Sequence, residues 1–292
     1  RVENFNIKRY DLVISSSWAF CHGLRRESAS TKHLAYVHTP MRWAWDMEKD
    51  YLTHENFFKF TQPLIRAQIK RLRKWDAVAG QRPDKIIANS NFVKTRIKKY
   101  WDRSSEVIYP PVQITEGGSF EHHGAFVSIS RLVPYKRVDL IVRAFNQLPE
   151  KKLIVIGSGP ELPKLKKMAR SNVKFIGRVT NREKFDILRG AIGFIQASKE
   201  DFGISVVEAQ ACGIPVLAFG EGGARETVMD AHSASNPTGM FFLEQSEQEL
   251  IEKLLEFFRV QFKPTDCIKN AKKFSVDRFR YRMLQQINSL TS

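Results

Sequence analysis

The stretch from residue 192 to residue 218 reads IGFIQASKEDFGISVVEAQACGIPVLA and contains one complete unit of parallel-sheet architecture. An apolar strand at 192–196 leads into a polar loop, a helical segment at 204–211 and a second apolar strand at 215–218. Strands that alternate with helices at this spacing predict a parallel sheet with helices on both faces.

The same alternation extends in both directions along the chain. Further strands are expected at 125–130, 152–156, 173–176 and 240–243, with helices near 137–147, 161–170, 182–189 and 224–229. The first 110 residues show strands at 10–15, 33–37, 85–88 and 106–109, with helices at 57–76 and 91–101. We therefore predict an α/β fold with two Rossmann-like parallel-sheet domains.

The boundary between the domains is marked by composition. Pro110 and Pro111 end the first pattern, and residues 115–124 have the glycine and polar content of a linker. We expect an N-terminal domain at 1–113, a C-terminal domain at 124–274, and a final helix at 275–292 that packs back toward the first domain. The tail from Gln248 to Leu290 is predicted to be helical throughout.

The composition excludes several classes of protein. The 292 residues are 42% hydrophobic and 27% charged, which is typical of a globular protein and not of a disordered or collagen-like chain. No apolar run approaches the ~20 residues that a membrane-spanning helix needs. Three widely spaced cysteines make neither a disulfide framework nor a Cys-x-x-Cys metal site, and they fit a reducing compartment.

The chain is strongly basic, with 47 Lys and Arg against 31 Asp and Glu, a net charge of +16. A protein with this charge is expected to meet anions such as nucleic acid, acidic lipid or phosphorylated small molecules, although a solvated basic surface is the alternative. No zinc-finger, repeat or RNA-recognition pattern is present, so nucleic acid is not the expected partner. The segment 57–75 has helical apolar spacing with basic residues on the other side. It fits an anionic membrane surface, or equally an ordinary surface helix whose apolar face joins the core.

Ligands of open parallel sheets bind beyond the carboxyl ends of the strands, so the residues after each strand are informative. Arg131 and Lys136 follow the first strand of the second half, where two cations can neutralise a diphosphate. Gly157 and Gly159 follow the next strand. The third glycine of the G-x-G-x-x-G dinucleotide-binding motif is absent, so this motif is not met. The two glycines instead predict a turn that a ligand can approach closely and that faces a nucleobase or a phosphate.

The central stretch adds a helix N-terminus and two carboxylates. Gly203, Ile204 and Ser205 open the helix, and the free N–H groups of such an end attract phosphate. Glu200 precedes the helix and Glu208 lies one turn inside it, within an apolar stretch. Since an unpaired buried carboxylate is costly, either ligand hydroxyls or a neighbouring cation must satisfy Glu208.

Taken in order, these motifs resemble the retaining glycosyltransferases of family 4, which have the two-domain GT-B fold. The resemblance covers nearly the whole chain. The matching segments are SRLVPYK at 130–136, GSGP at 157–160, FIGRV at 175–179, the pair Glu200 and Glu208, CGIPV at 212–216, VHTPMR at 37–42 and ANSNFV at 88–93. More narrowly, they resemble mannosyltransferases of bacterial surface-polysaccharide and O-antigen assembly.

The resemblance implies roles for the strand-end residues. Arg131 and Lys136 would hold the donor diphosphate, and the backbone of 203–205 would cradle its distal phosphate. Glu208 would bind the ribose hydroxyls, and Glu200 the hydroxyls of the transferred sugar.

The remaining donor contacts and one residue of the first domain follow from the same resemblance. Arg178 and Val179 would lie against the base, with Gly157 and Gly159 also on the donor side. His38 would face the reaction from the first domain, near the acceptor and the transferred sugar. The alternative for His38 is a strand-end histidine packed against Trp43 or Trp45.

The function implied is the transfer of a hexose, in particular mannose from GDP-mannose, to a lipid-linked glycan acceptor at the inner face of the cytoplasmic membrane. No Asp-x-Asp triplet occurs, so neither a metal nor a cofactor beyond the nucleotide sugar is expected. Two alternatives remain open, a nucleotide-sugar epimerase on the same fold and a basic nucleic-acid-binding protein.

One departure from the family pattern concerns the first domain. Family members begin with a strand and a glycine-bearing loop that faces the donor diphosphate, and nothing before Tyr10 supplies these. We therefore expect the first domain to be incomplete at its N-terminus.

Overall fold

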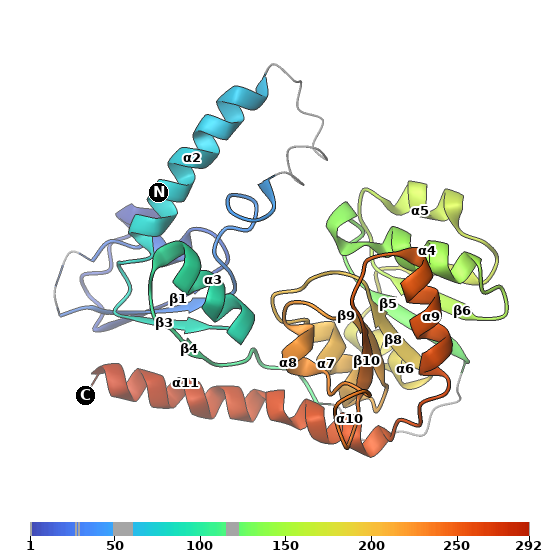
Figure 1. Ribbon diagram of the computed structural model, residues 1–292. Coiled ribbons are helices and arrows are strands. Elements are labelled where there is room, and N and C mark those ends of the chain that lie inside the picture. Colours follow the sequence, from blue (N-terminus) through green and yellow to red (C-terminus); the bar gives the residue numbers. More distant parts are fainter. Residues whose placement is uncertain (1, 27, 29, 49–60, 115–122, 292) are drawn as a thin grey trace. The chain divides into compact units, whose positions relative to one another are not determined.

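The computed structural model describes residues 2–291 apart from 27, 29, 49–60 and 115–122, and it divides into two compact units. Unit 1 consists of residues 1–110 and 279–292, and unit 2 of residues 111–278. Each unit is built on its own parallel sheet, of four strands in unit 1 and six in unit 2 (Figure 1). The predicted α/β architecture with two parallel sheets is confirmed.

The sheet of unit 2 has the strand order β10-β9-β8-β5-β6-β7. Its strands are β5 (Ala125–Ile129), β6 (Lys152–Ile156), β7 (Val173–Gly177), β8 (Gly193–Gln196), β9 (Val216–Phe219) and β10 (Gly239–Phe242). The chain adds β6 and β7 on one side of β5, and then returns to place β8, β9 and β10 on the other. The strand order therefore reverses between β5 and β8, where open α/β sheets bind their ligands.

Both faces of this sheet are apolar and covered by helices (Figure 1). One face packs against α4 (Val138–Asn146), α5 (Leu162–Met168) and α9 (Glu247–Phe257). The other packs against α6 (Asn181–Arg189), α7 (Ile204–Ala211) and α8 (Ala224–Thr227), and α10 (Pro264–Ala271) lies next to α7. Neighbouring residues such as Phe126 and Val127 point to opposite faces, which explains why the strands are continuous apolar runs.

The sheet of unit 1 has the order β1-β2-β3-β4. Its strands are β1 (Leu12–Ser17), β2 (Lys32–Val37), β3 (Lys85–Ala88) and β4 (Glu106–Val107), and its helices include α2 (Gln62–Ala79) and α3 (Asn91–Trp101). The final helix α11 (Val276–Thr291) contributes Phe279 and Met283 to a core cluster with Leu34 and Tyr36. The C-terminal residues are therefore part of the packing of unit 1.

Helix α2 carries most of the segment predicted to be amphipathic, although its expected first residues, 57–60, lie outside the described residues. Ile65, Ile69 and Trp75 pack with a core cluster of unit 1 that includes Met41. The apolar side of α2 is thus largely core, as the ordinary-helix alternative predicts. None of the helices in the described ranges is long and apolar enough to cross a membrane.

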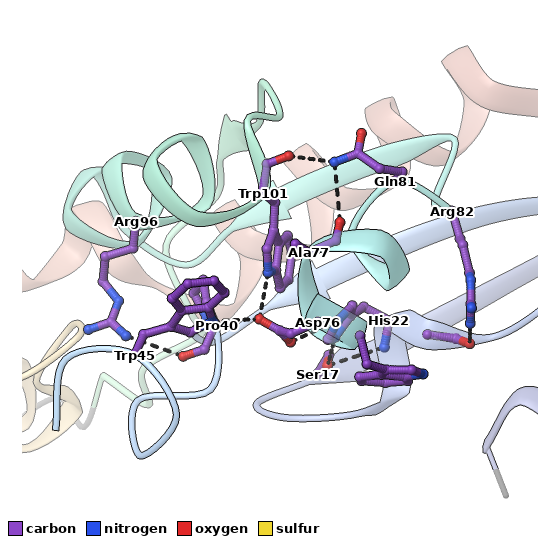
Figure 2. Close-up of polar contacts among 12 residues, drawn as sticks. Ser17, His22, Pro40, Trp45, Asp76, Ala77, Gln81, Arg82, Arg96 and Trp101 are labelled. Carbon is purple, nitrogen blue, oxygen red and sulfur yellow. Dashed lines mark hydrogen bonds and ion pairs between the residues drawn. The ribbon is translucent and has the colours of Figure 1, made fainter. Parts of the chain in front are cut away.

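A fully buried carboxylate organises the loops around α2 (Figure 2). Asp76 Oδ2 accepts hydrogen bonds from Trp45 Nε1 at 2.8 Å and from Trp101 Nε1 at 2.7 Å. Asp76 Oδ1 lies 3.2 Å from His22 Nε2, and His22 Nδ1 is hydrogen-bonded to Ser17 Oγ at 3.0 Å. One carboxylate therefore joins four segments that are distant in the sequence.

Several expected element boundaries differ from the structure; α2, α5 and α8, for example, end two or three residues from the expected positions. Three further differences have a clear setting in the chain. The strand expected at 10–15 runs from Leu12 to Ser17, because Tyr10 belongs to a turn in which its N–H bonds to the carbonyl of Ile7 at 3.2 Å. The strand expected at 106–109 ends at Val107, close to the prolines at 110 and 111. The tail is interrupted at 258–263, since the residue before Pro264 is disfavoured in a helix and Pro264 begins a new one. It is interrupted again at 272–275, where a 3-10 turn (Lys272–Phe274) and Ser275 separate α10 from α11.

Candidate functional site

Two predicted site residues meet where the strand order of unit 2 reverses. Lys136 ends the short helix η4 (Pro134–Lys136) after β5, and Glu200 lies in the loop after β8. Lys136 Nζ donates to Glu200 Oε1 at 2.5 Å, and the two side chains are only 18% and 15% exposed. The cation and the carboxylate that the sequence placed 64 residues apart therefore form one pair.

Two further residues fix this pair. The buried Ser198 Oγ donates to the same Glu200 oxygen at 2.5 Å. Gln245, which follows β10, donates from Nε2 to the carbonyl of Ala197 at 2.7 Å, and its Oε1 accepts from Arg137 Nη1 at 3.0 Å. Gln245 thereby ties the loop that carries Lys136 to the loop that carries Glu200. Sequence reasoning missed it because no motif spacing links residue 245 to either loop.

Arg131, the other predicted diphosphate ligand, lies at the start of the same loop as Lys136. Its side chain is exposed, and the guanidinium makes no hydrogen bond or ion pair with the described part of the chain. The structure therefore leaves this cation open to solvent, while Lys136 is already paired.

The glycines after β6 allow two loop backbones to touch. Leu132 N–H donates to the carbonyl of Ser158 at 2.9 Å. A Cβ at Gly157, whose φ is +137°, would lie 1.9 Å from the carbonyl oxygen of Ser130, and one at Gly159 would lie 2.2 Å from that of Leu132. The predicted close-approach turn is present, and the group approached in the structure is the neighbouring loop.

A second pair of loops, after β8 and β9, is joined in the same way. Gly223 N–H donates to the carbonyl of Glu200 at 2.8 Å, and a Cβ at Gly222 would lie 2.3 Å from that oxygen. An ion pair of 2.6 Å between Lys199 and Glu221 closes the contact. These glycines set the backbone position of Glu200, a role that the sequence pattern did not reveal.

Helix α7 begins directly after the Glu200 loop. Gly203 is the N-cap, with a φ of +89°, and Ile204 is 47% exposed. Val206 is the first residue of α7 whose N–H bonds back, to the carbonyl of Gly203 at 3.0 Å. The N–H groups of Ile204 and Ser205 precede any intrahelical partner, which is the arrangement that binds anions.

Glu208 is satisfied by a neighbouring cation. Lys184 Nζ, on α6, donates to Glu208 Oε1 at 2.7 Å, and the two side chains are 16% and 14% exposed. No residue in the described ranges bonds to Oε2, so this oxygen can accept from a ligand hydroxyl. The ion pair is the alternative that the sequence left open, and the sequence did not identify Lys184 as the partner.

The residues predicted to face the base lie after β7. Arg178 is exposed, and its Nε donates to Ser158 Oγ at 2.7 Å. Val179 is partly buried against the core on the α6 and α7 side of the sheet. The loops after β6 and β7 are also joined by Gly157 N–H, which donates to the carbonyl of Gly177 at 2.7 Å.

His38 belongs to unit 1, at the carboxyl end of β2. Its Nε2 is hydrogen-bonded to Ser16 Oγ at 2.8 Å, and its ring packs edge-on against Tyr36 with 5.3 Å between the ring centroids, whereas the alternative interpretation placed it against Trp43 or Trp45. Burial lowers the pKa of His38 below its ordinary value, so the ring is uncharged at neutral pH. A neutral imidazole held by a serine can exchange hydrogen bonds with a hydroxyl-bearing ligand.

A metal centre is not formed by the described residues, among which no three His, Cys, Asp or Glu side chains gather in a suitable group. The charges that the unit 2 edge presents come from protein cations, carboxylates and a helix N-terminus.

Comparison with known families and proteins gives concordant results. Residues 113–274, more than half of the chain, match the family model described as glycosyl transferases group 1, and residues 2–116 match the model described as glycosyltransferase family 4. A GDP-mannose-dependent monoacylated alpha-(1-6)-phosphatidylinositol monomannoside mannosyltransferase of Corynebacterium glutamicum is 35% identical over 142 residues. That match covers 44% of this chain and 36% of the relative.

A more distant relative matches over a longer stretch. The human GDP-Man:Man(3)GlcNAc(2)-PP-Dol alpha-1,2-mannosyltransferase is 26% identical over 232 residues, which are 69% of this chain and 46% of the relative. The chain thus spans less than half the length of either mannosyltransferase.

Among solved structures, the Anabaena HepE protein in complex with UDP superposes with a TM-score of 0.68 at 20% identity, over 89% of this chain and 73% of that protein. The TarM protein of S. aureus superposes with a TM-score of 0.68 at 19% identity, over 94% of this chain and 54% of that protein. These likenesses agree with the GT-B fold that the sequence predicts.

Proposed function

This chain belongs to the glycosyl transferases group 1 family, and on that premise we propose that it is a retaining glycosyltransferase using a nucleotide-sugar donor. The observation that carries the proposal is the Lys136–Glu200 pair, which lies beside the N-terminus of α7 at the reversal point of the strand order. A cation, a carboxylate and open N–H groups at one sheet edge suit a diphosphate joined to a sugar.

The donor proposed is GDP-mannose, and the acceptor a lipid-linked glycan. Two relatives support this choice, since their names specify GDP-mannose or GDP-Man as donor and a phosphatidylinositol mannoside or a dolichol-linked glycan as acceptor. The link to O-antigen and lipopolysaccharide assembly is proposed from the motif resemblance alone.

Transfer breaks the bond between the sugar's anomeric carbon and the diphosphate oxygen. In the proposed reaction, Arg131, Lys136 and the N–H groups of 204–205 stabilise the charge that develops on this leaving group. The acceptor hydroxyl bonds to the same face of the anomeric carbon, and its proton passes to the departing phosphate oxygen. We propose that protein cations replace a metal here.

Lys136 has to serve both the carboxylate and the phosphate. Its ammonium group has three N–H donors, so it can keep Glu200 while donating to a phosphate oxygen. Glu200 would then accept from hydroxyls of the transferred sugar, and Glu208 Oε2 from the ribose. His38 of unit 1 is proposed to face the transferred sugar as a neutral hydrogen-bonding group.

A lipid-linked acceptor would bring the protein to the inner face of the cytoplasmic membrane. The exposed basic residues of α2, which include Arg66 and Lys70, would provide the attraction to anionic lipid, while the apolar side of α2 stays in the core. Sedimentation with anionic vesicles that is lost with added salt would support this contact. Equal sedimentation with neutral vesicles would contradict it.

The function is tested by incubating the chain with GDP-mannose and a lipid-linked glycan, with and without a metal chelator. We expect mannose transfer with the anomeric configuration kept and with no loss of rate in chelator. A nucleotide-sugar epimerase would instead change the sugar without an acceptor. A nucleic-acid binder would bind polynucleotide in preference to the nucleotide sugar, with a steep salt dependence.

A further inference from the structure

We propose that Arg178, held in place by Ser158, selects guanine as the base of the donor nucleotide. The inference rests on the proposed function, because it assumes that a nucleotide sugar binds at the carboxyl edge of the unit 2 sheet. It adds the feature of the donor that the strand-end motifs leave open, the identity of the base.

The ion pair of Glu208 indicates where the base would lie. Glu208 is bonded to Lys184 at 2.7 Å, and Lys184 is one helical turn from Thr180, whose carbonyl accepts from Lys184 N–H at 2.9 Å. Thr180 is the N-cap of α6 and directly follows Val179. A ribose held by Glu208 therefore has the segment 177–179 as its neighbour on the α6 side.

A hydrogen bond holds the guanidinium of Arg178, which belongs to this segment, in a fixed orientation. Its Nε donates to Ser158 Oγ at 2.7 Å, and Ser158 lies in the loop whose Gly157 bonds to the carbonyl of Gly177. The bond to Nε fixes the plane of the guanidinium and leaves Nη1 and Nη2, which bond to no other described residue, as a two-pronged donor.

The surroundings leave room for a flat ring. Arg178 is exposed, and a Cβ built on Gly177 would have no heavy atom within 4 Å. The side chain of Arg178 is therefore accessible to a ligand, and the backbone of the neighbouring Gly177 is open on the side where a Cβ would lie.

A fork of two N–H donors is complementary to two adjacent acceptors on one ring edge. Guanine presents O6 and N7 side by side, and arginine binds this pair bidentately. Adenine places an amino donor beside N7. Uracil and thymine place the N3–H donor beside O4, so neither offers two adjacent acceptors. The geometry therefore favours GDP over ADP, UDP and dTDP.

Calorimetric titration of the full chain with GDP, ADP and UDP tests the inference. We expect the unsubstituted chain to bind GDP most tightly. Arg178→Ala should weaken GDP roughly 5- to 150-fold, the range for loss of one bidentate base contact, and leave ADP and UDP within about twofold. Arg178→Lys should lose most of the same preference, since an ammonium group keeps the charge without the fork.

Two further variants separate base recognition from general attraction. Ser158→Ala keeps the guanidinium but removes the bond that orients it, so its GDP loss should be smaller than that of Arg178→Ala. Arg182→Ala removes an exposed cation from the first turn of α6 and should leave all three affinities unchanged.

The inference is overturned if Arg178→Ala weakens all three nucleotides equally, because the side chain then acts on the phosphates. It is also overturned if the unsubstituted chain prefers UDP and Arg178→Ala leaves that preference intact. In the first case the proposed function survives. In the second the chain still binds a nucleotide as a glycosyltransferase would, but GDP-mannose fails as the proposed donor. If no nucleotide binds at all, the inference and the proposed function fail together.

Discussion

The two units hold their strand-end loops in different ways. In unit 2, neighbouring loops touch backbone to backbone at Gly157 and Gly222, where a side chain would strike a carbonyl oxygen. In unit 1, the loops around α2 are joined by side chains that converge on the buried Asp76 (Figure 2). The first design leaves cations and helix N–H groups at the surface for a ligand, whereas the second uses its polar groups internally.

This difference explains why the candidate donor site lies in unit 2. In unit 2 the glycine contacts fix the loops through backbone atoms, so the side chains of these loops remain available. Arg131 is exposed to solvent, and Lys136 pairs with Glu200. In unit 1, Trp45, Trp101 and His22 are committed to one carboxylate. The substitutions below each disrupt the loop contacts of one unit and leave those of the other unit intact.

The largest effect is expected from Asp76→Ala. The change leaves the indole N–H groups of Trp45 and Trp101 without their acceptor, and each donor left unsatisfied in this way costs about 1–3 kcal/mol. Denaturant unfolding followed by tryptophan fluorescence should show this loss, while GDP affinity at unit 2 stays unchanged in native conditions. A loss below about 1 kcal/mol would mean that the network contributes little.

Gly157→Ala should disrupt the backbone contact between the loops after β5 and β6 of unit 2. Its positive φ and the contact with the Ser130 carbonyl together should cost about 3 kcal/mol, the upper end of the range for a strained residue, and should weaken GDP binding. Gly124→Ala is the matched control, since Gly124 also has a positive φ but a Cβ there meets nothing within 4 Å. If the two variants lose the same stability, the loop contact is unimportant.

The two glutamates should respond differently to nucleotide and nucleotide sugar. Glu208→Gln should weaken GDP and GDP-mannose alike by about 1.5 kcal/mol, roughly tenfold, as expected for a charge-assisted hydrogen bond. Glu200→Gln should spare GDP and impair only steps that involve the sugar. Calorimetry with both ligands makes the comparison, and an equal loss of GDP affinity in both variants would contradict the assignment.

Gln245→Ala should have the smallest effect. It removes the tie between the Lys136 and Glu200 loops and should weaken GDP-mannose binding by about 1 kcal/mol, the contribution of an ordinary hydrogen bond. Thermal unfolding should change little. Gln248→Ala, at an exposed residue of α9, is the control, and an equal effect there would refute a positioning role for Gln245.

Local patterns were sufficient to predict the fold and much of the unit 2 edge. Strand-to-helix alternation is a short-range property, so the ten strands of the described residues were all predicted, eight of them to within one residue at each end. The proximity of Lys136 and Glu200 could be expected because parallel strands end at one edge. The interruption at 258–263 was missed because apolar residues at helical spacing continue through it, although Pro264 marks the restart.

Contacts between distant segments could not be predicted in this way. Lys184 and Gln245 reach their partners through the packing of α6 and of the segment after β10, and no sequence spacing encodes those contacts. No sequence motif singles out Asp76, whose three partners Trp45, Trp101 and His22 come from three other segments of unit 1. Such a network depends on tertiary packing alone.

Hydrogen exchange of the chain with and without GDP-mannose reports on both units in one experiment and so shows which sheet edge binds the donor. We expect slower exchange at 130–137, 157–159, 177–180 and 199–206 in unit 2, with the amides of the Asp76 network unchanged. Protection confined to unit 1, or protection in unit 2 that avoids the loops after β5 and β8, would contradict the claim that this sheet edge is the donor site.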